Sequence, residues 1–375
     1  MNRWQWLLGL LAFAFFLQAA PAQGVIGMVN QHKLRKVNMK LCGQVIDFTH
    51  NHGSDNRIWS PALCERRDVY VYLPPGYSPD RKYPMGIFLH GSNQDEHFFL
   101  RQPVQLFDQA IANGELPPVI IVAPDGSLQG RPSFLHTASF FANSRAGNYE
   151  DYLMTDVWNF VMENFPIYPE REAHSLVGVS AGGSAAFALA MKHKDRVKTA
   201  VGFAPALNLR WVDANGRYDT KFDPDNWGWR TSYKPLEVIG RPAMGLVKIR
   251  FCTLLSPLVG KGGDVEAELS RVNPIEIMER TNLQDKELNL YIAYGGKDEF
   301  NIDSHVDSFL YMAKQRGVSV TVDFDPNGKH NVATGARQFP AAIRWVAPIM
   351  ARYAVQRNDP DAAPVGTDGK TAARP

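Results

Sequence analysis

The sequence predicts an α/β fold in which a mostly parallel central sheet carries helices on both faces. Short apolar runs alternate along the chain with longer segments of helical periodicity. The apolar runs are unbroken, as is typical of parallel strands that are covered on both faces. With 45% hydrophobic and 21% charged residues in 375, the chain has ample apolar material for a large core.

The predicted strands are recognised by their length and by the turn residues that end them. The first is stopped by Pro74, Pro75 and Gly76, and proline cannot continue a central strand. The segments that we expect to form strands are Asp68–Tyr77, Met85–Gly91, Val119–Gly126, His174–Val179, Val197–Pro205, Leu288–Gly296 and Val318–Asp325.

Three segments between or after these strands have helical patterns. Glu150–Phe165 places Leu153, Val157, Phe160, Val161 and Phe165 on one stripe. Asp303–Gly317 opens on an Asp that we expect to cap the helix and closes on Gly317, a favoured stop residue. Phe339–Ala354 supplies a last helix.

The two ends of the chain differ in composition from the rest. Residues 1–22 combine an early arginine, an apolar run and the sequence Ala20-Pro21-Ala22, which predicts a secretory signal peptide cleaved after Ala22. The apolar run is too short to span a bilayer. We expect one domain over residues 23–354, a disordered tail over 355–375, and a secreted or periplasmic protein.

Residues 207–273 interrupt the alternation of strands and helices. This segment is irregular, rich in Trp, Gly and Pro, and too long for a plain connection, so we interpret it as an insertion near the active site. Trp211, Trp227 and Trp229 could form a stacking surface for a carbohydrate or aromatic group, or could anchor the insertion to the sheet.

A reactive serine is predicted at Ser180. The sequence Gly178-Val179-Ser180-Ala181-Gly182 fits the G-x-S-x-G pattern, and it lies between a predicted strand and an Ala-rich helix. This strand–turn–helix setting is that of a nucleophile elbow. The turn is tight, so Gly178 and Gly182 leave room where neighbouring backbone approaches closely.

A serine hydroxyl needs a base, and the base needs a carboxylate to orient it. Asp298 follows one predicted strand and His330 follows the next, in the order Ser, Asp, His that an elbow serine requires. Glu299 and Asp303 are alternative acids, although Asp303 fits a helix cap better. His305 is the alternative base, but it lies inside a predicted helix.

An oxyanion at the reacting carbonyl needs two backbone N–H donors. The residue after the nucleophile, Ala181, should supply one. The loop that follows the Met85–Gly91 strand should supply the other, with Ser92 as the preferred donor and Asn93 as the alternative.

The cysteines and histidines give weaker signals. In an oxidising compartment the three cysteines allow one disulfide, and Cys42 with Cys64 is the preferred pair over any pair with Cys252. No C-x-x-C or H-E-x-x-H pattern occurs, and His50 with His52 is a weak candidate for a metal site. We expect neither a metal nor a cofactor.

Taken together, these motifs resemble the putative esterase family of α/β-hydrolases, which includes esterase D, feruloyl and acetylxylan esterases and mycolyltransferases. The resemblance covers about Arg67 to Tyr353 and rests on "VYVYLPPGYSPDRKYPMGIFLHG", "NYEDYL", "GVSAGG", "GGKDEFN" and "GKH". It implies an α/β-hydrolase fold with Ser180 as nucleophile, Asp298 as acid and His330 as base. The chain departs from many relatives in lacking a Trp soon after His330 and in the length of its insertion.

The sequence therefore predicts an exported serine esterase that hydrolyses carboxylic esters, among them acyl groups linked to carbohydrates. An acyltransferase with the same three residues and an inactive binding protein on the same fold are the alternatives. The expected partner is a small-molecule or polysaccharide-linked ester. A net charge of +2 gives no reason to expect nucleic acid or stable membrane insertion, and the oligomeric state is not predicted.

Overall fold

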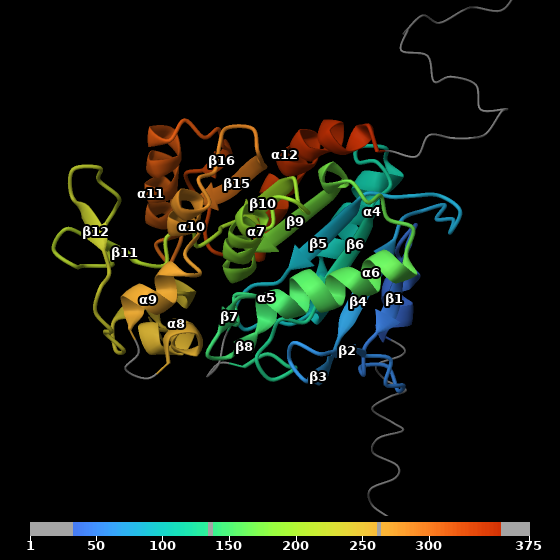
Figure 1. The fold of residues 1–375 in the computed structure, drawn as a ribbon, viewed down its shortest axis with the longest axis horizontal. Coiled ribbons are helices and arrows are strands. Elements are labelled where there is room, and N and C mark those ends of the chain that lie inside the picture. The colour runs from blue at the N-terminus through green and yellow to red at the C-terminus, as the bar shows by residue number, and fades with distance from the viewer. Residues whose placement is uncertain (1–32, 134–137, 261–263, 354–375) are drawn as a thin grey trace, which may run out of the picture.

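The protein is built around one eight-stranded sheet (Figure 1). The computed structural model describes residues 33–133, 138–260 and 264–353, so the predicted signal peptide and the predicted tail lie outside the described residues. In spatial order the strands are β1 (Gln44–Phe48), β4 (Val69–Leu73), β6 (Ile120–Pro124), β5 (Met85–Leu89), β9 (His174–Val179), β10 (Thr199–Phe203), β15 (Asn289–Gly295) and β16 (Thr321–Asp325).

The sheet is mostly parallel, as the unbroken apolar runs predict. The strands from β6 to β16 pair in parallel, whereas β4 runs antiparallel to both β6 and β1. Every residue of β4, β5, β6 and β10 is buried. The edge strand β16 differs from the prediction, since it alternates exposed and half-buried residues and has a partner on one side only.

The register of the strands brings their carboxyl ends together. Leu89 at the end of β5 pairs with Gly178 of β9, and Val179 pairs with Phe203 at the end of β10. Phe203 in turn pairs with Ala293 of β15, and Gly295 with Asp325 at the end of β16. The loops after β5, β9, β15 and β16 therefore leave the sheet at one edge, where open α/β sheets bind ligands.

Helices cover both faces of the sheet, and each face has its own apolar core. One core joins the sheet to α5 (Tyr149–Asp151), the π-helical turn η1 (Tyr152–Val157), α6 (Trp158–Asn164), α7 (Ala181–Lys192), α10 (Pro274–Arg280) and α11 (Ile302–Gln315). The other joins it to α3 (His97–Arg101), α4 (Pro103–Ala112) and α12 (Val332–Ala351). Figure 1 shows α6 and α7 in front of the sheet and α12 along the top of the molecule.

The predicted helices are present, with two differences in detail. Residues 150–165 form α5, η1 and α6 in succession rather than one regular α-helix. The N-cap position of α11 is Asn301, which has a positive φ of 54° and makes no side-chain capping hydrogen bond, and not Asp303. Asp303 lies in the first turn and pairs with Lys221, so the prediction of an Asp cap is wrong, whereas Gly317 does follow the helix with a φ of 67°.

Residues 207–273 form a subdomain around a small apolar cluster, which it shares with Ala138, Phe140, Ala142 and Ala181. It contains the short strand pairs β11–β12 and β13–β14 and the helices α8 (Phe251–Val259) and α9 (Val265–Ser270). Leu209, Ile239 and Phe251 belong to the apolar cluster that holds it together. Its strands are β11 (Trp211–Asp213), β12 (Trp227–Trp229), β13 (Val238–Gly240) and β14 (Ile249–Arg250).

The tryptophans of the insertion pack within it. Trp211 is completely buried, and its indole N–H donates to the Tyr218 carbonyl. The ring of Trp229 lies 5.0 Å from that of Trp227 and under the Arg210 guanidinium. Trp229 also packs against the apolar core of the sheet, which favours the anchoring interpretation over a stacking surface.

The predicted disulfide is not formed. Cys42, Cys64 and Cys252 are all free thiols. The Cys42 amide, at the entry to β1, is held by Asp108 of α4. Cys64 lies in the turn between β2 (Ile58–Ser60) and β3 (Glu65–Arg67), a hairpin that forms a separate sheet. Proximity in sequence suggested the pair, but the two residues are fixed by different elements.

No helix in the described ranges has both the length and the apolar character that crossing a membrane requires.

The core contacts predict the cost of losing a buried aromatic ring. Phe309 of α11 is fully buried and packs edge-to-face on Phe187 of α7, with ring centroids 5.7 Å apart. We expect Phe309→Ala to lower the free energy of unfolding by about 3–5 kcal/mol, measured by urea denaturation. The control, Lys314→Ala on an exposed face of the same helix, should stay within about 0.5 kcal/mol of the parent chain. Equal values for both variants would contradict this packing.

Candidate active site

Ser180 stands on a sharp turn between β9 and α7. Its φ of 53° and ψ of −118° are strained for a residue with a side chain, and such strain is characteristic of functional turns. The Ser180 amide donates to the Phe203 carbonyl at 2.9 Å, which ties the turn to the end of the neighbouring strand β10. The serine hydroxyl therefore projects beyond the carboxyl edge of the sheet.

The two glycines of the pentapeptide have the role that the sequence indicated. A Cβ on Gly178 would lie 2.1 Å from the Gly182 carbonyl oxygen. A Cβ on Gly182 would lie 2.2 Å from the Leu89 carbonyl oxygen of β5. Any larger residue would push the turn away from the sheet, so the backbone path around Ser180 requires glycine at both positions.

The structure brings Ser180, His330 and Asp298 into one hydrogen-bonded series. His330 Nε2 lies 3.0 Å from Ser180 Oγ, and His330 Nδ1 lies 2.7 Å from Asp298 Oδ2. The three residues come from the loops after β9, β16 and β15, which are separated by up to 150 positions in the chain. Because a carboxylate can only accept, Nδ1 carries the hydrogen and Nε2 of the neutral ring faces the serine as an acceptor.

The electrostatics of the series favour a basic imidazole. Burial alone lowers the pKa of His330, because a buried site disfavours the charged ring. The negative charge of Asp298 and its hydrogen bond oppose burial, with a further contribution from Glu299, and the net effect raises the pKa of His330 above its ordinary value. The Asp298 side chain is itself out of contact with solvent.

Glu299 and Asp303, the alternative acids, have partners other than the His330 imidazole, whereas Asp298 is fully engaged. Asp298 Oδ1 accepts from the Phe300 amide at 2.8 Å, so both carboxylate oxygens of Asp298 are used. Glu299 accepts from the backbone amide of His330 at 2.9 Å and does not reach the imidazole ring through a hydrogen bond. Asp303 is paired with Lys221, as described above.

The insertion holds the loop that carries Asp298. The Tyr218 hydroxyl donates to the Phe300 carbonyl at 2.6 Å, and the Asn301 side chain donates to the Tyr218 and Thr220 carbonyls. The Arg241 amide donates to the Glu299 carbonyl at 2.8 Å. Hydrogen bonds thereby fix four consecutive residues, 298–301. These bonds come from the loop that carries His330, from the insertion and from the backbone of the four residues themselves.

Phe300 transmits this restraint to the imidazole. Its ring lies 4.7 Å from that of His330, and on the insertion side it packs against Gly240. A Cβ on Gly240 would lie 2.4 Å from the Phe300 ring, so glycine is needed for this approach. The base is therefore held by a carboxylate on one side and by an aromatic ring that the insertion supports.

His305, the alternative base, lies outside the series. The Tyr218 hydroxyl hydrogen is used on a carbonyl, so the 2.9 Å contact between that hydroxyl and His305 Nε2 requires the imidazole to donate. Burial lowers the pKa of His305 to about 3, which keeps the ring neutral. His305 thus supports Tyr218 and the clamp on the acid loop.

The loop after β5 faces Ser180, as predicted. Gly91, Ser92, Ser180 and Ala181 line the same cavity. The Gly91 amide is occupied, because it donates to Gln94 Oε1 at 2.8 Å, whereas no hydrogen bond of the Ser92 amide joins it to another described residue. Asn93 has a positive φ of 57°, so the backbone turns sharply at this point.

His90 fixes this loop, a role that the sequence did not reveal. Its Nε2 accepts from the Gly126 amide at 2.9 Å, which leaves Nδ1 to donate to the Gly91 carbonyl. Burial lowers the pKa of His90, so the ring remains neutral in this bridge. The signal for this role in the sequence is the His90-Gly91 pair after β5. The residue that His90 binds, Gly126, lies in the loop after another strand, β6.

A cavity of about 290 Å³ opens beside Ser180 and His330. Its wall is mostly apolar, and it includes eight phenylalanines, two of them (Phe140 and Phe251) in the cluster that the insertion shares with the sheet edge. The eight are Phe88, Phe98, Phe107, Phe140, Phe203, Phe251, Phe300 and Phe339. Ligand pockets are commonly apolar in this way, with a few convergent polar groups that fix orientation.

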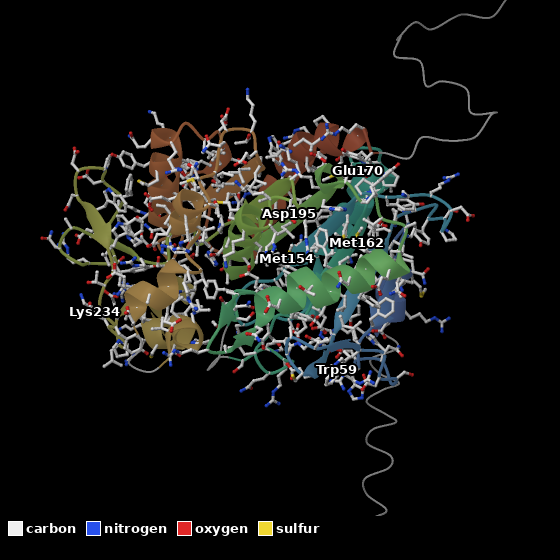
Figure 2. The ribbon with its side chains drawn as sticks, viewed as in Figure 1. Trp59, Met154, Met162, Glu170, Asp195 and Lys234 are labelled. Carbon is white, nitrogen blue, oxygen red and sulfur yellow. The ribbon has the colours of Figure 1, made fainter. Side chains whose placement is uncertain are left out.

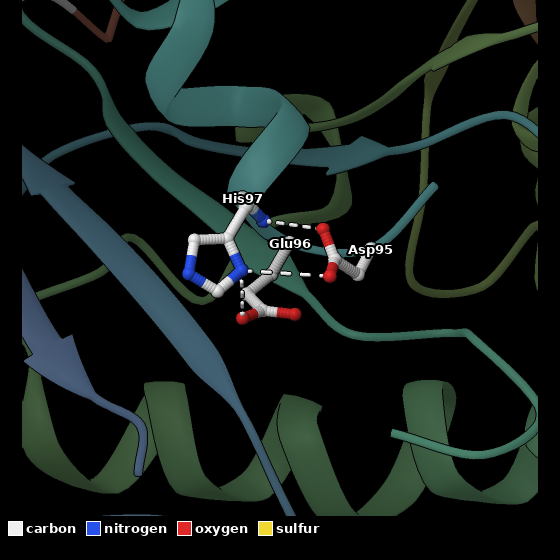
Figure 3. A group of neighbouring side chains, drawn as sticks. All are labelled: Asp95, Glu96 and His97. Carbon is white, nitrogen blue, oxygen red and sulfur yellow. Dashed lines mark hydrogen bonds and ion pairs between the residues drawn. The ribbon is translucent and has the colours of Figure 1, made fainter. Parts of the chain in front are cut away.

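A second cluster of titratable groups lies in the same loop region (Figure 3). His97 Nδ1 is 3.0 Å from Glu96 Oε1 and 3.5 Å from Asp95 Oδ2. Burial lowers the pKa of His97, but the hydrogen bonds and charges of the two acids outweigh it and raise the pKa to about 10. In this arrangement His97 is the ion-paired partner of both acids. Of the weaker candidates, His52 contacts the Tyr70 hydroxyl and His50 is exposed.

The fold and the site together define an α/β-hydrolase: a mostly parallel sheet, a serine on an elbow after a central strand, and Asp and His on the loops of the last two strands. The comparisons with known proteins agree. Residues 60–331 match the model of the family described as "Putative esterase". The match covers more than half of the chain, so the chain belongs to this family.

The curated relatives share only part of their length with this chain. An esterase of Mycobacterium tuberculosis is 27% identical over 173 residues, which are 44% of this chain and 36% of that protein. Endo-1,4-beta-xylanase Y of Acetivibrio thermocellus is 32% identical over 107 residues, 28% of this chain and 9% of the relative.

Solved structures show the same fold at low identity. An S-formylglutathione hydrolase from Agrobacterium tumefaciens has a TM-score of 0.58 at 16% identity and covers 83% of this chain and 96% of its own. A ferulic acid esterase has a TM-score of 0.56 at 15% identity, with 83% and 99% covered. A CE1 ferulic acid esterase from Anaeromyces mucronatus, in complex with ferulic acid, has a TM-score of 0.52 at 17% identity, with 80% and 89% covered.

The pKa of His330 tests the geometry of the site without reference to activity. We expect NMR titration of the His330 ring nitrogens to give a pKa above the ordinary value of about 6.5. Glu299→Gln retains an acceptor for the His330 amide but removes the charge, so the pKa should fall. Asp298→Asn, which removes the larger contribution, should lower it further.

The matched control is Glu163→Gln, which removes the same charge from an exposed position on α6. It should leave the titration unchanged. The His330 resonances are assigned from their loss in His330→Gln. An unshifted midpoint in both Glu299→Gln and Asp298→Asn would show that the imidazole is not held by these carboxylates.

Proposed function

We propose that the chain is a serine esterase that cleaves carboxylic esters through Ser180, His330 and Asp298. The observation that carries this proposal is the hydrogen-bonded series from Asp298 through His330 to a serine in an elbow conformation, at the wall of an apolar cavity. A serine, a base and an orienting carboxylate are the groups that acyl transfer to serine requires.

In the proposed reaction each of these groups has a role in the first half of the cycle. Ser180 Oγ attacks the ester carbonyl carbon while its proton passes to His330 Nε2, 3.0 Å away. Asp298 stabilises the imidazolium that forms and keeps Nδ1 protonated. His330 then gives the proton to the alcohol oxygen as the ester C–O bond breaks, which leaves an acyl group on Ser180.

Water completes the reaction in the second half. With the alcohol gone, a water molecule attacks the acyl carbon and loses a proton to His330 Nε2. The imidazolium returns that proton to Ser180 Oγ as the acid is released. Each proton transfer uses the same nitrogen, so the orientation of one ring serves both halves of the cycle.

The oxyanion that forms in both halves would be held by backbone amides of Ala181 and Ser92. Ala181 is the first residue of α7, where an amide has no partner inside the helix and the helix dipole favours negative charge. Ser92 lines the same cavity, and the neighbouring Gly91 amide is already occupied. The bridge through His90 would keep this loop in place before substrate arrives.

The apolar cavity supports a substrate with a bulky apolar group on one side of the ester. Its volume of about 290 Å³ is nearly twice that of the roughly 150 Å³ cavity that holds a benzene ring in a protein core. Aromatic acyl groups, including those linked to polysaccharides, fit this description. One solved structure with the same fold is a ferulic acid esterase in complex with ferulic acid, which supports the same class of substrate.

The proposal is tested with a panel of p-nitrophenyl esters of increasing apolar size. We expect hydrolysis by the parent chain and a loss of at least about a thousandfold in kcat for Ser180→Ala, because the covalent route is removed. The control is Ser184→Ala, which removes a serine hydroxyl one turn further along α7 and leaves Ser180, His330 and Asp298 unchanged. Equal rates for the parent chain and Ser180→Ala would remove Ser180 from the mechanism.

We also propose that the protein is exported, on the strength of the signal-peptide pattern in residues 1–22. Expressed in a bacterial host, the protein should be recovered outside the cytoplasm. Amino-terminal sequencing should begin at Gln23, directly after the Ala-Pro-Ala site. Protein that stays in the cytoplasm with residues 1–22 intact would contradict export.

A further inference from the structure

Three exposed apolar side chains lie together on one hairpin of the insertion, and two of them, Met244 and Leu246, are the most exposed large apolar side chains of the described residues. Met244 is 91% exposed, Leu246 82% and Val247 47%. They belong to the tip, residues 241–248, that connects β13 to β14. Apolar side chains that are exposed together, unlike single ones, are a feature of interaction surfaces.

The far part of this tip, residues 244–248, is exposed, whereas Arg241 at its base donates to the Glu299 carbonyl. Val238 pairs with Arg250 and Gly240 with Ile249, so the two strands run antiparallel up to the tip. Met244 has a left-handed conformation, with a φ of 57°, followed by Gly245 with a φ of 85°. The turn thus projects its apolar side chains outward, and none of the three contributes to the buried core of the insertion.

Basic side chains flank the apolar tip. Arg241, Lys248 and Arg250 are exposed, and no acidic side chain in the described ranges forms an ion pair with Lys248 or Arg250. Arg241 has Asp219 as a partner at 3.7 Å. This arrangement matches the layers of a lipid surface. The apolar residues at the tip would reach the acyl region, and the cations behind them would lie at the level of the anionic headgroups.

The tip is also continuous with the wall of the active-site cavity. Ile239 on β13 and Phe251, directly after β14, line the cavity together with Ser180 and His330. The Phe251 amide donates to the Glu237 carbonyl, which closes the base of the hairpin. A surface that contacts the tip would therefore lie next to the elements that border the cavity.

We propose that the hairpin tip, residues 241–248, docks the protein on an anionic lipid surface by inserting Met244, Leu246 and Val247 between the headgroups. Lys248 and Arg250 supply the attraction to anionic headgroups. This contact is peripheral and reversible, and it does not depend on the esterase activity. A second copy of the chain would be the other occupant of such a tip, but two copies would bring the same unpaired cations together.

The test is co-sedimentation with vesicles of phosphatidylcholine that contain about one third phosphatidylglycerol. The chain that begins at Gln23 is used, because it contains every described residue and lacks the apolar segment of residues 1–22. We expect binding that weakens as salt is raised, since the cations act at the surface. Met244→Ser/Leu246→Ser should lower the partition coefficient about tenfold or more, and Lys248→Gln/Arg250→Gln should reduce its salt dependence.

The matched control is Met39→Ser/Trp59→Ser. These residues are 76% and 57% exposed, so the control removes a comparable apolar surface elsewhere. In Figure 2, Trp59 lies at the lower right, far from Lys234, which precedes the hairpin at the left edge. The control should bind like the parent chain. Unchanged thermal unfolding establishes that each variant is folded.

Three results would overturn the proposal. The first is an absence of binding by the parent chain, and the second is equal binding by the parent chain and Met244→Ser/Leu246→Ser. The third is a dimer in lipid-free buffer that dissociates in the same variant, which would assign the tip to a second copy. None of these readouts requires hydrolysis, so an inactive protein would still decide the question.

Discussion

The close approach of the β9–α7 turn to the backbone of β5 is the constraint on which the site depends. Gly182 allows this approach, Gly178 leaves room for the backbone of Gly182 within the turn, and Ser180 has a positive φ between them. The serine is fixed by backbone packing rather than by side-chain contacts. The sheet thus determines where the Ser180 hydroxyl lies, and the other groups of the site are placed around it.

The acid and base reach that position by a different principle. They sit on loops, which are ordinarily the more mobile parts of a fold. Here the loops are joined to each other, because the Lys297 amide donates to the Gly328 carbonyl, and the acid loop is joined to the insertion by the Tyr218, Asn301 and Arg241 hydrogen bonds. The 2.7 Å contact between imidazole and carboxylate is thus supported from several sides.

The sequence could predict the sheet and the three residues of the series because their signals are local. Buried parallel strands are continuous apolar runs, and the elbow is a pentapeptide between a strand and a helix. Asp298 and His330 could be located because each follows directly on a strand. The strand order and register then bring them together without any further information in the loops themselves.

The features that escaped prediction depend on contacts between distant segments. Glu299 accepts from the His330 amide and His90 bridges two strand loops, and neither partner can be found from spacing. The disulfide prediction failed for the same reason, since Cys42 and Cys64 are near in sequence, but Cys42 precedes β1 and Cys64 lies in the turn of the separate β2–β3 hairpin. The cap of α11 was misplaced because Asp303 has a tertiary partner, Lys221.

The clamp on the acid loop has a consequence for how this protein can diverge. The insertion supplies part of the cavity wall through Ile239 and Phe251, and it also holds residues 298–301 through its backbone. A replacement of the insertion that widens the cavity for a new substrate would at once release the loop that orients the imidazole. Selectivity and turnover are therefore not independent traits in this architecture, and new insertions have to be acquired together with compensating contacts to that loop.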